Sequence, residues 1–339
     1  MKFYRFLNDY SEGAHPSILK QLSETNLIQQ EGYGDDDYCK NAAELIRKEI
    51  RNTDADIHFV SGGTQANLLC MSAFLKPYES IVAPKTAHIE IHEAGAIEFT
   101  GHKTNTVEPE NGKLLPKHIT EQVEFHYDEH MVVPKIAFIS NTTEIGTVYT
   151  RAELEALSNV CKKHGMYLYI DGARLGAALM SDKNDMSLAE ISSLVDAFYI
   201  GGTKNGALIG EAIVINNPEL KEKFRYNMKQ KGALLAKGRI IGIQFEQLFT
   251  DGKYYELATY AYKMAQKLAN GLKEKGIGFY TQPESNQIFP ILSKTVIEKL
   301  EKKFGFYIWT KYDENNSVVR LVCSWATKEE AVDEFIKSL

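Results

Sequence analysis

Apolar residues recur along this chain with two periods, which together predict alternating strands and helices. Short and almost wholly apolar runs are typical of strands buried in a parallel sheet. Longer stretches with apolar residues three and four positions apart predict the helices between them, as at residues 36–50 and 64–75. This alternation indicates an α/β fold with a mostly parallel sheet. The expected strands are residues 57–63, 80–84, 135–140, 166–171, 197–202 and 211–216.

The pattern changes near residue 217, where long helical stretches replace the regular alternation. Capping boxes of the form T-x-x-E indicate helix starts at Thr150 and Thr327. We therefore expect a large domain of residues 1–240, with an N-terminal arm at residues 1–15, and a small α/β domain of residues 241–339. The later part should contain helices at 218–230, 237–250, 252–276 and 295–304, and short strands at 287–292 and 317–325.

Composition and charge narrow the class of protein. The 339 residues carry 39 Lys+Arg and 45 Asp+Glu, and a net charge of −6 argues against nucleic acid as the main partner. No apolar run approaches the ~20 residues of a membrane helix, and residues 1–13 lack the apolar stretch of a signal peptide. We therefore expect a cytoplasmic protein with no membrane partner. The four cysteines, which should be reduced thiols without a metal, are Cys39, Cys70, Cys161 and Cys323.

A glycine-containing turn follows the first expected strand, at a type of position where open α/β sheets bind ligands. In SGGTQAN, residues 61–67, glycines allow close approach of an anion and the following helix offers free N–H groups. The hydroxyl of Thr64 could add another donor. A tight strand–helix turn with Thr64 as helix cap explains the motif equally well.

Two ionisable residues follow later strands. Asp171 ends a strongly apolar strand, where burying it is costly unless it is paired. A protonated pyridine nitrogen would suit it, and pairing with Arg174 or capping a helix is the alternative. Lys204 stands in GGTKNG, from which its amine could reach a cleft and form a Schiff base if its pKa is lowered. A lysine in a surface turn is the alternative.

Two histidines stand four residues apart in AHIEIHEAG, residues 87–95. His88 and His92 could share one helix face. The two imidazoles could bind zinc, but the sequence indicates no third ligand. One imidazole could instead stack on an aromatic ring. A histidine with only a structural role in a helix is a further possibility.

The order of these motifs resembles the aspartate-aminotransferase superfamily of pyridoxal-phosphate enzymes, and within it the threonine aldolase / aromatic amino acid β-eliminating lyase family. The resemblance implies fold type I, with a mostly parallel seven-stranded sheet between helices in the large domain and a small C-terminal α/β domain. It also implies pyridoxal 5'-phosphate as cofactor. The matching segments are YGDD (33–36), GTQANL (63–68), AHIEIHEAGA (87–96), SNTTEIGTVYT (140–150), DGARLGAAL (171–179), TK (203–204), MKQKGALLA (228–236) and VRLVCSW (319–325).

The resemblance further implies roles for individual residues. Lys204 would carry the cofactor, Asp171 would pair with its pyridinium nitrogen, and His88 would stack on its ring near the substrate hydroxyl. A guanidinium fork suits the substrate carboxylate. The residues implied at the cofactor are Gly63, Thr64, His88, Asp171, Arg174, Thr203, Lys204 and Lys229, and those implied at the substrate are Asn8, Tyr33, Arg174 and Arg320.

Several positions depart from the family pattern. Asn8 stands where the family has a serine, and Thr203 replaces the serine before the lysine, which Asn205-Gly206 follow in place of Gly-Leu. Lys229 replaces an arginine, keeping the charge that a phosphate needs without the bidentate fork.

The activity implied by the resemblance is cleavage of the Cα–Cβ bond of a β-hydroxy-α-amino acid. L-Threonine or L-allo-threonine would give glycine and acetaldehyde, with His88 as the candidate base for the β-hydroxyl proton. β-Elimination or transamination on the same scaffold, with Lys204 as proton shuttle, is a second hypothesis. A binding protein that has lost catalysis is a third. Tyr33 and Lys229 would reach a neighbouring site, which implies a homodimer or homotetramer.

Overall fold

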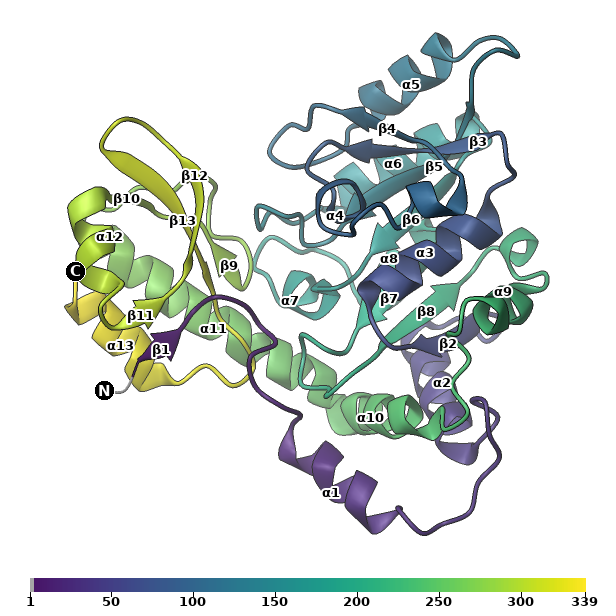
Figure 1. Cartoon of the computed structure of the whole chain (residues 1–339), viewed down its shortest axis with the longest axis horizontal. Coiled ribbons are helices and arrows are strands. Elements are labelled where there is room, and N and C mark those ends of the chain that lie inside the picture. The colour runs from purple at the N-terminus through teal and green to yellow at the C-terminus, as the bar shows by residue number, and fades with distance from the viewer. Residues whose placement is uncertain (1–2) are drawn as a thin grey trace.

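A seven-stranded sheet organises the larger part of the molecule (Figure 1). The computed structural model describes residues 3–339, and its main sheet has the strand order β2-β8-β7-β6-β5-β3-β4. β8 runs antiparallel to β2 and β7, and the other four pairings are parallel, as expected. The strands are β2 (Asp56–Val60), β3 (Glu79–Pro84), β4 (Thr104–Val107), β5 (Val133–Ser140), β6 (Tyr167–Asp171), β7 (Ala197–Gly201) and β8 (Glu211–Ile215).

Six of these strands are the apolar runs expected from the sequence. Every residue of β3, β7 and β8 is buried, which explains why their sequences lack alternation. β4 was not anticipated, because its sequence TNTV is mostly polar. It lies at the edge of the sheet, pairs only with β3, and leaves part of its length accessible.

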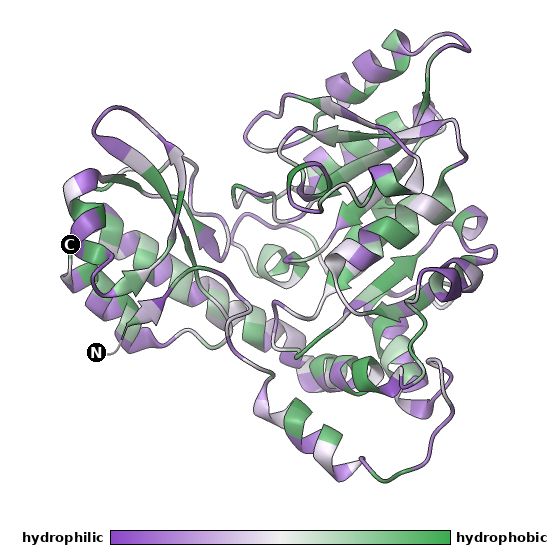
Figure 2. Cartoon of the chain, in the orientation of Figure 1, coloured by the Kyte–Doolittle hydropathy of each residue, from purple (hydrophilic) through white to green (hydrophobic). Residues whose placement is uncertain are grey.

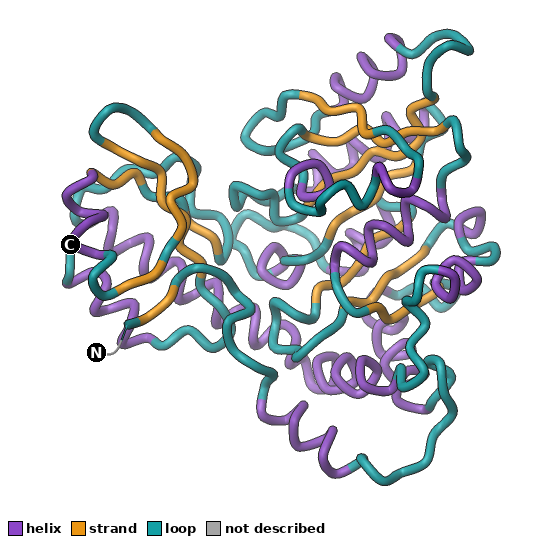
Figure 3. Tube along the Cα trace, viewed as in Figure 1, coloured by secondary structure: helices purple, strands orange, loops and turns teal. Residues whose placement is uncertain are grey.

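Helices cover both faces of the sheet (Figure 3). One apolar cluster packs α2, α6, α8 and α10 against one face, and a second packs α3 and α9 against the other. The strands form the apolar centre in Figure 2, with mixed polar surfaces on the helices around them. The helices of this part are α1 (Pro16–Glu24), α2 (Asp37–Ile50), α3 (Gly63–Phe74), α4 (His88–Ile91), α5 (Pro116–Phe125), α6 (Arg151–Lys163), α7 (Leu175–Leu179), α8 (Leu188–Leu194), α9 (Phe224–Gln230) and α10 (Arg239–Phe249).

Two expected helix features differ from the structure. The helix expected over 218–230 is divided into a short 3₁₀ turn, Pro218–Leu220, and α9, and Lys223, with a φ of 56°, lies directly before α9. Apolar spacing across this stretch could not reveal the left-handed residue. The capping box at Thr327 is also wrong, because its hydroxyl accepts a hydrogen bond from the Ser324 amide at 2.7 Å and the last helix begins two residues later. The box at Thr150 is confirmed.

A second, smaller unit holds the C-terminal part of the chain and both termini (Figure 1). Strands β9, β10, β12 and β13 form an antiparallel sheet, and β1 pairs in parallel with β11. Its elements are β1 (Tyr4–Arg5), β9 (Gln287–Ile288), β10 (Ile291–Ser293), α12 (Lys294–Leu300), β11 (Phe304–Gly305), β12 (Tyr307–Lys311), β13 (Asn316–Val322) and α13 (Glu329–Lys337).

The long helix α11 (Lys253–Glu274) joins the two units. Tyr254 and Leu257, in its first turns, belong to the large apolar core, whereas residues from Met264 onward belong to the small one. α10 packs closely on α2 within the large unit. The expected domain boundary at 240/241 falls within α10, and the two apolar cores separate within α11.

Within residues 3–339, no helix is long and apolar enough to cross a membrane. All four cysteines are buried and free, as expected for reduced thiols.

Candidate active site

A cavity of about 290 Å³ lies at the carboxyl ends of β5, β6 and β7. Parallel strands bring their carboxyl ends to one edge, so motifs far apart in the sequence meet there. Of the predicted site residues, the cavity gathers Gly63, Thr64, His88, Asp171, Arg174, Thr203 and Lys204. The other lining residues are Tyr10, Ser61, Gly62, Ser140, Thr142, Glu144, Ala173, Tyr199 and Glu211.

Asp171 is held at the floor of this cavity by three donors. Its Oδ1 accepts hydrogen bonds from the Tyr199 hydroxyl at 2.5 Å and the Ala173 amide at 3.1 Å, and its Oδ2 accepts one from Asn67 Nδ2 at 3.0 Å. The side chain is only 4% exposed. Burial and the neighbouring carboxylate raise the pKa of Tyr199 well above its ordinary value, so its hydroxyl remains a donor. Asp171 does not pair with Arg174, which corrects that alternative.

Gly63 is required by this arrangement. A Cβ at this position would lie 2.7 Å from the Tyr199 hydroxyl oxygen, which is already bonded to Asp171. Gly62 caps the start of α3, so Thr64 lies inside the first turn instead of capping it. The turn thus brings its backbone to the cavity, and its sequence allows the close approach expected of an anion-binding loop.

Lys204 lies at the cavity, which excludes the surface-turn interpretation. It follows β7 by three residues, and its Nζ lies 5.9 Å from the ring centre of Tyr10. Burial and then the charge of Arg174 lower its pKa, while Asp9 and other carboxylates oppose the shift. A lysine in such surroundings holds its proton less firmly and is a better nucleophile.

His88 opens the one-turn helix α4 and is linked to Asp171 through two side chains. Its Nδ1 lies 2.8 Å from Glu93 Oε1, which also accepts a hydrogen bond from Asn67 Nδ2 at 2.8 Å. Asn67 in turn bonds Asp171. Because a carboxylate only accepts, Nδ1 carries a hydrogen, and in the neutral ring Nε2 is then an acceptor. His92 is exposed, with its ring centre 5.4 Å from that of His88.

Arg174 pairs with a residue that the sequence did not suggest. Its Nε and Nη2 donate to the two carboxylate oxygens of Asp9 at 2.8 and 3.0 Å. Asp9 is 1% exposed and also accepts a hydrogen bond from Asn286 at 2.9 Å. Although burial opposes it, the charge of Arg174 lowers the pKa of Asp9. This pair anchors the N-terminal arm beside the cavity.

Arg320, on β13, retains unused donors. Its guanidinium stacks over the rings of Tyr307 and Trp309, at 5.0 and 5.5 Å, and Nη2 donates to the Leu7 carbonyl at 3.2 Å. Its buried Nε has no partner among the described residues. Burial and then the charge of Arg174 lower its pKa. Asn8 holds a turn of the arm, because its Oδ1 accepts from the Tyr10 amide and the Ser11 hydroxyl.

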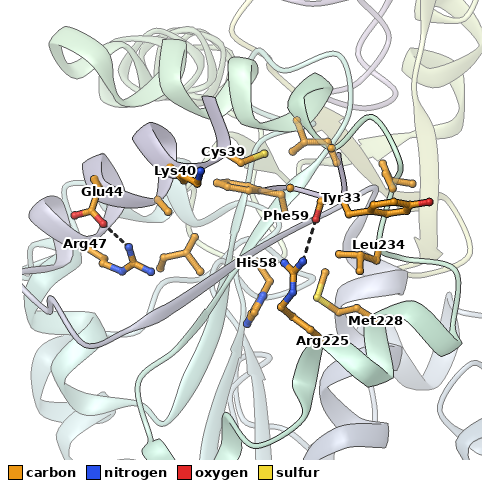
Figure 4. A pocket seen from close by; sticks show the side chains of 16 residues that line it. Tyr33, Cys39, Lys40, Glu44, Arg47, His58, Phe59, Arg225, Met228 and Leu234 are labelled. Atoms are coloured by element: carbon orange, nitrogen blue, oxygen red, sulfur yellow. Dashed lines mark hydrogen bonds and ion pairs between the residues drawn. The ribbon is translucent and has the colours of Figure 1, made fainter. Parts of the chain in front are cut away.

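Tyr33 and Lys229 lie outside the candidate cavity. Tyr33 lines a second cavity of about 190 Å³, where Arg225 donates to its carbonyl oxygen (Figure 4). The Nζ of Lys229 lies 4.4 Å from the Tyr33 ring centre. Lys231, two positions on, lines a separate depression together with residues 61–65. Within one chain, the structure therefore does not bring Tyr33 or Lys229 to Lys204.

Sequence reasoning missed several residues of the site. Glu211 begins β8 and accepts a hydrogen bond from the Gly202 amide at 2.7 Å, and burial raises its pKa to about 7. Glu144 follows β5 in NTTE, where an acid just beyond an apolar strand was a usable signal. No comparable pattern marks the remaining ones, which are Asp9, Asn67, Glu93 and Tyr199.

The fold and this strand-edge site define the chain as a fold type I protein, the class of the pyridoxal-phosphate aminotransferases. A solved structure of a mutant Thermus thermophilus aspartate aminotransferase matches with a TM-score of 0.74 at 17% identity, covering 99% of this chain and 91% of that one. A sequence model described as β-eliminating lyase matches residues 9–295. The chain belongs to this family, which confirms the resemblance seen in its motifs.

Two relatives are more similar in sequence. A low specificity L-threonine aldolase of Pseudomonas aeruginosa is 34% identical over 340 residues, which cover 99% of this chain and 96% of the relative. The solved structure of a Leishmania major threonine aldolase is 47% identical with a TM-score of 0.97, and 98% of each chain is covered.

Proposed function

We propose that this protein is a pyridoxal-phosphate-dependent aldolase that cleaves L-threonine or L-allo-threonine to glycine and acetaldehyde. The observation that carries the proposal is the meeting of Lys204, Asp171 and His88 at one cavity. The similarity to threonine aldolases over nearly the whole chain supports the same reaction.

The cavity fits pyridoxal phosphate by the chemistry of its groups. Lys204 would hold the cofactor through its amine, and the carboxylate of Asp171, fixed by three donors, would face the ring nitrogen. Residues 62–64 and Thr203 would hold the phosphate, at the helix start where a Cβ on Gly63 would intrude. When bound, the cofactor supplies an electron sink for the electron pair left on Cα.

Other side chains around the cofactor site would position the substrate. His88, with Nδ1–H committed to Glu93, would lie against the ring with Nε2 directed to the substrate. Arg320 has unused donors for the substrate carboxylate, and Arg174 retains Nη1 beyond its two bonds to Asp9. Asn8 would support the arm beside them.

The assembly proposed is a homodimer or a homotetramer built from such dimers. Tyr33 is 44% exposed, and Lys229 beside it is also exposed, so both side chains are available to another chain. Each would complete the site of a neighbouring subunit. Within each chain, we propose that the large unit binds the cofactor and the small unit contributes Arg320.

A product assay tests the activity. The purified protein with pyridoxal phosphate is incubated with a panel of β-hydroxy-α-amino acids, with and without an added 2-oxo acid as amino acceptor, and glycine and aldehyde are measured beside newly formed 2-oxo acids and ammonia. Glycine with acetaldehyde from threonine is expected. A 2-oxo acid with ammonia as the main products would replace aldol cleavage by β-elimination, and a 2-oxo acid formed without ammonia, only when the acceptor is present, would replace it by transamination.

A further inference from the structure

Glu144 brings a carboxyl group to the cavity beside His88. It follows the end of β5 by four residues, and its Oε1 accepts hydrogen bonds from the Ser140 hydroxyl at 2.6 Å and from the His88 amide at 3.1 Å. These two contacts fix the carboxyl group against the start of α4. The backbone amide of Glu144 itself also donates to the carboxyl group. Because Glu144 lines the cavity, its carboxyl group is within reach of a molecule bound there.

The other carboxyl groups at this cavity have identifiable partners. Asp171 receives three hydrogen bonds at the floor, and Asp9 is held by Arg174. Glu211 accepts a hydrogen bond from the Gly202 amide, and the charge of Lys204 acts to lower its pKa. Glu144 is the carboxyl that shares the side of the cavity with His88, where the proposed function places the substrate's β-hydroxyl group.

The surroundings of Glu144 suit a proton acceptor. Burial and the charge of Asp171 raise its pKa, while the hydrogen bonds from Ser140 and the His88 amide lower it. A base is most effective when its pKa lies near the working pH. The titratable and charged groups facing it across the cavity and behind it are His88, Glu93, Tyr149, Asp171, Arg174, Lys204 and Glu211.

We propose that Glu144 is a further catalytic residue, which accepts the β-hydroxyl proton of the substrate as the Cα–Cβ bond breaks. This assignment rests on the proposed aldolase activity. The O–H electron pair becomes the second bond of the aldehyde carbonyl, and the pair of the Cα–Cβ bond remains with Cα. Cα then takes up one proton and Glu144 loses one, so the amino acid is converted to glycine and aldehyde with no net gain of protons. In this assignment His88 packs against the cofactor ring, and the hydroxyl proton is directed to Glu144.

Glu144→Gln separates this role from a structural one, because the amide keeps the shape and the acceptor oxygen. Threonine cleavage is compared with exchange of the α-hydrogen of glycine in D₂O, which involves no β-hydroxyl. We expect cleavage to fall by at least about 100-fold, glycine exchange to change by less than a few-fold, and the absorbance of the bound cofactor to persist. Glu155→Gln, an exposed change on α6, serves as the matched control.

Each other outcome is decisive. Equal losses in cleavage and exchange would make Glu144 a structural residue, and undiminished cleavage would leave the proton to His88. Both overturn the inference. A wild-type protein that exchanges glycine but does not cleave threonine contradicts the proposed function itself, independently of Glu144.

Ser140→Ala provides a second test that leaves the carboxyl group in place. Loss of the hydroxyl removes a hydrogen bond that lowers the pKa of Glu144. The base acts when deprotonated, so the rise of kcat with pH on threonine should move to higher pH, while the profile of glycine exchange stays in place. An unshifted threonine profile would overturn the assignment even if the glutamine variant failed to fold.

Discussion

Arg174 and Asp9 form a two-pronged ion pair that closes a sequence separation of 165 residues and ties the N-terminal arm to the edge of the main sheet. Asp171 ends β6 three residues before Arg174, but its carboxylate already accepts hydrogen bonds from Tyr199, Asn67 and the Ala173 amide. The Arg174 guanidinium therefore pairs with Asp9 of the N-terminal arm. This arrangement keeps Tyr10 of the same arm at the cavity.

Asp9→Ala should lower the free energy of unfolding by about 3–5 kcal/mol, because it leaves the buried Arg174 charge without its partner. Urea denaturation of the variant and of Asp333→Ala, an exposed control on α13, measures this difference. A loss no larger than that of the control would show that water replaces the carboxylate.

The same pair predicts a pH dependence of stability. The pKa of Asp9 is lower in the folded protein than in the unfolded chain, so its stabilisation is present above a pH of about 4 and is lost as the pH falls through the folded value. The free energy of unfolding should decline toward acid pH more steeply in the wild type than in Asp9→Asn. If the free energy of unfolding declined equally with pH in both proteins, Asp9 would not be the group responsible.

Lys204→Ala should abolish covalent attachment of pyridoxal phosphate and leave the fold intact, since the side chain lines a cavity and does not support a core. Borohydride reduction followed by peptide mapping detects the attachment. The label should be found on the wild-type peptide that contains Lys204 and should also be present in Lys237→Ala, an exposed control. Label on another lysine would refute the site.

Asp171→Asn should retain bound cofactor but lower kcat on threonine by at least about 100-fold, because a neutral amide no longer stabilises a protonated ring nitrogen. The absorbance of the bound cofactor and the steady-state rate are measured together. Unchanged turnover would mean that Asp171 serves only the hydrogen bonds with Tyr199 and Asn67.

Arg320→Ala should raise KM for threonine and leave the cofactor spectrum unchanged. A hydrogen bond to a charged group contributes about 1.5–3 kcal/mol, which corresponds to roughly a 10- to 150-fold change. Arg320→Lys, which keeps the charge, should recover part of the affinity. If both variants alter only thermal stability, the arginine merely stacks on Tyr307 and Trp309.

Mixed assemblies test whether two chains share a site. Lys204→Ala chains are combined with chains that carry Tyr33→Ala and Lys229→Glu under conditions of subunit exchange. If Tyr33 and Lys229 serve the neighbouring site, hybrid dimers contain one complete site, and activity should exceed that of both parents. A fully active monomer in sedimentation experiments would exclude the shared site.

The sequence predicted the main sheet well because burial on both faces leaves a plain apolar signal, as in the runs of β5 and β7. Asp171 and Lys204 could be found for the same reason, since parallel strands bring their ends to one edge. β4 escaped notice because an edge strand buries little, and the break at Lys223 depends on a backbone conformation that side-chain periodicity does not report.

The partners of the site residues were less accessible to sequence reasoning. Asp9 lies in an arm with no periodic pattern, and Asn67 looks like an ordinary residue of α3 until Glu93 and Asp171 are placed on either side of it. Such contacts depend on how α3, α4 and the arm pack around the sheet. Local spacing carries no information about that packing.

The sharing of α11 between two apolar cores has a thermodynamic consequence. Tyr254 and Leu257 pack in the large core, and Leu268 and Leu272 pack in the small one, on a single uninterrupted helix. Loss of apolar contacts at one end of the helix weakens the rest of it, because helix formation is cooperative. We therefore expect melting of one core to lower the stability of the other, so that the two units unfold together despite having separate sheets.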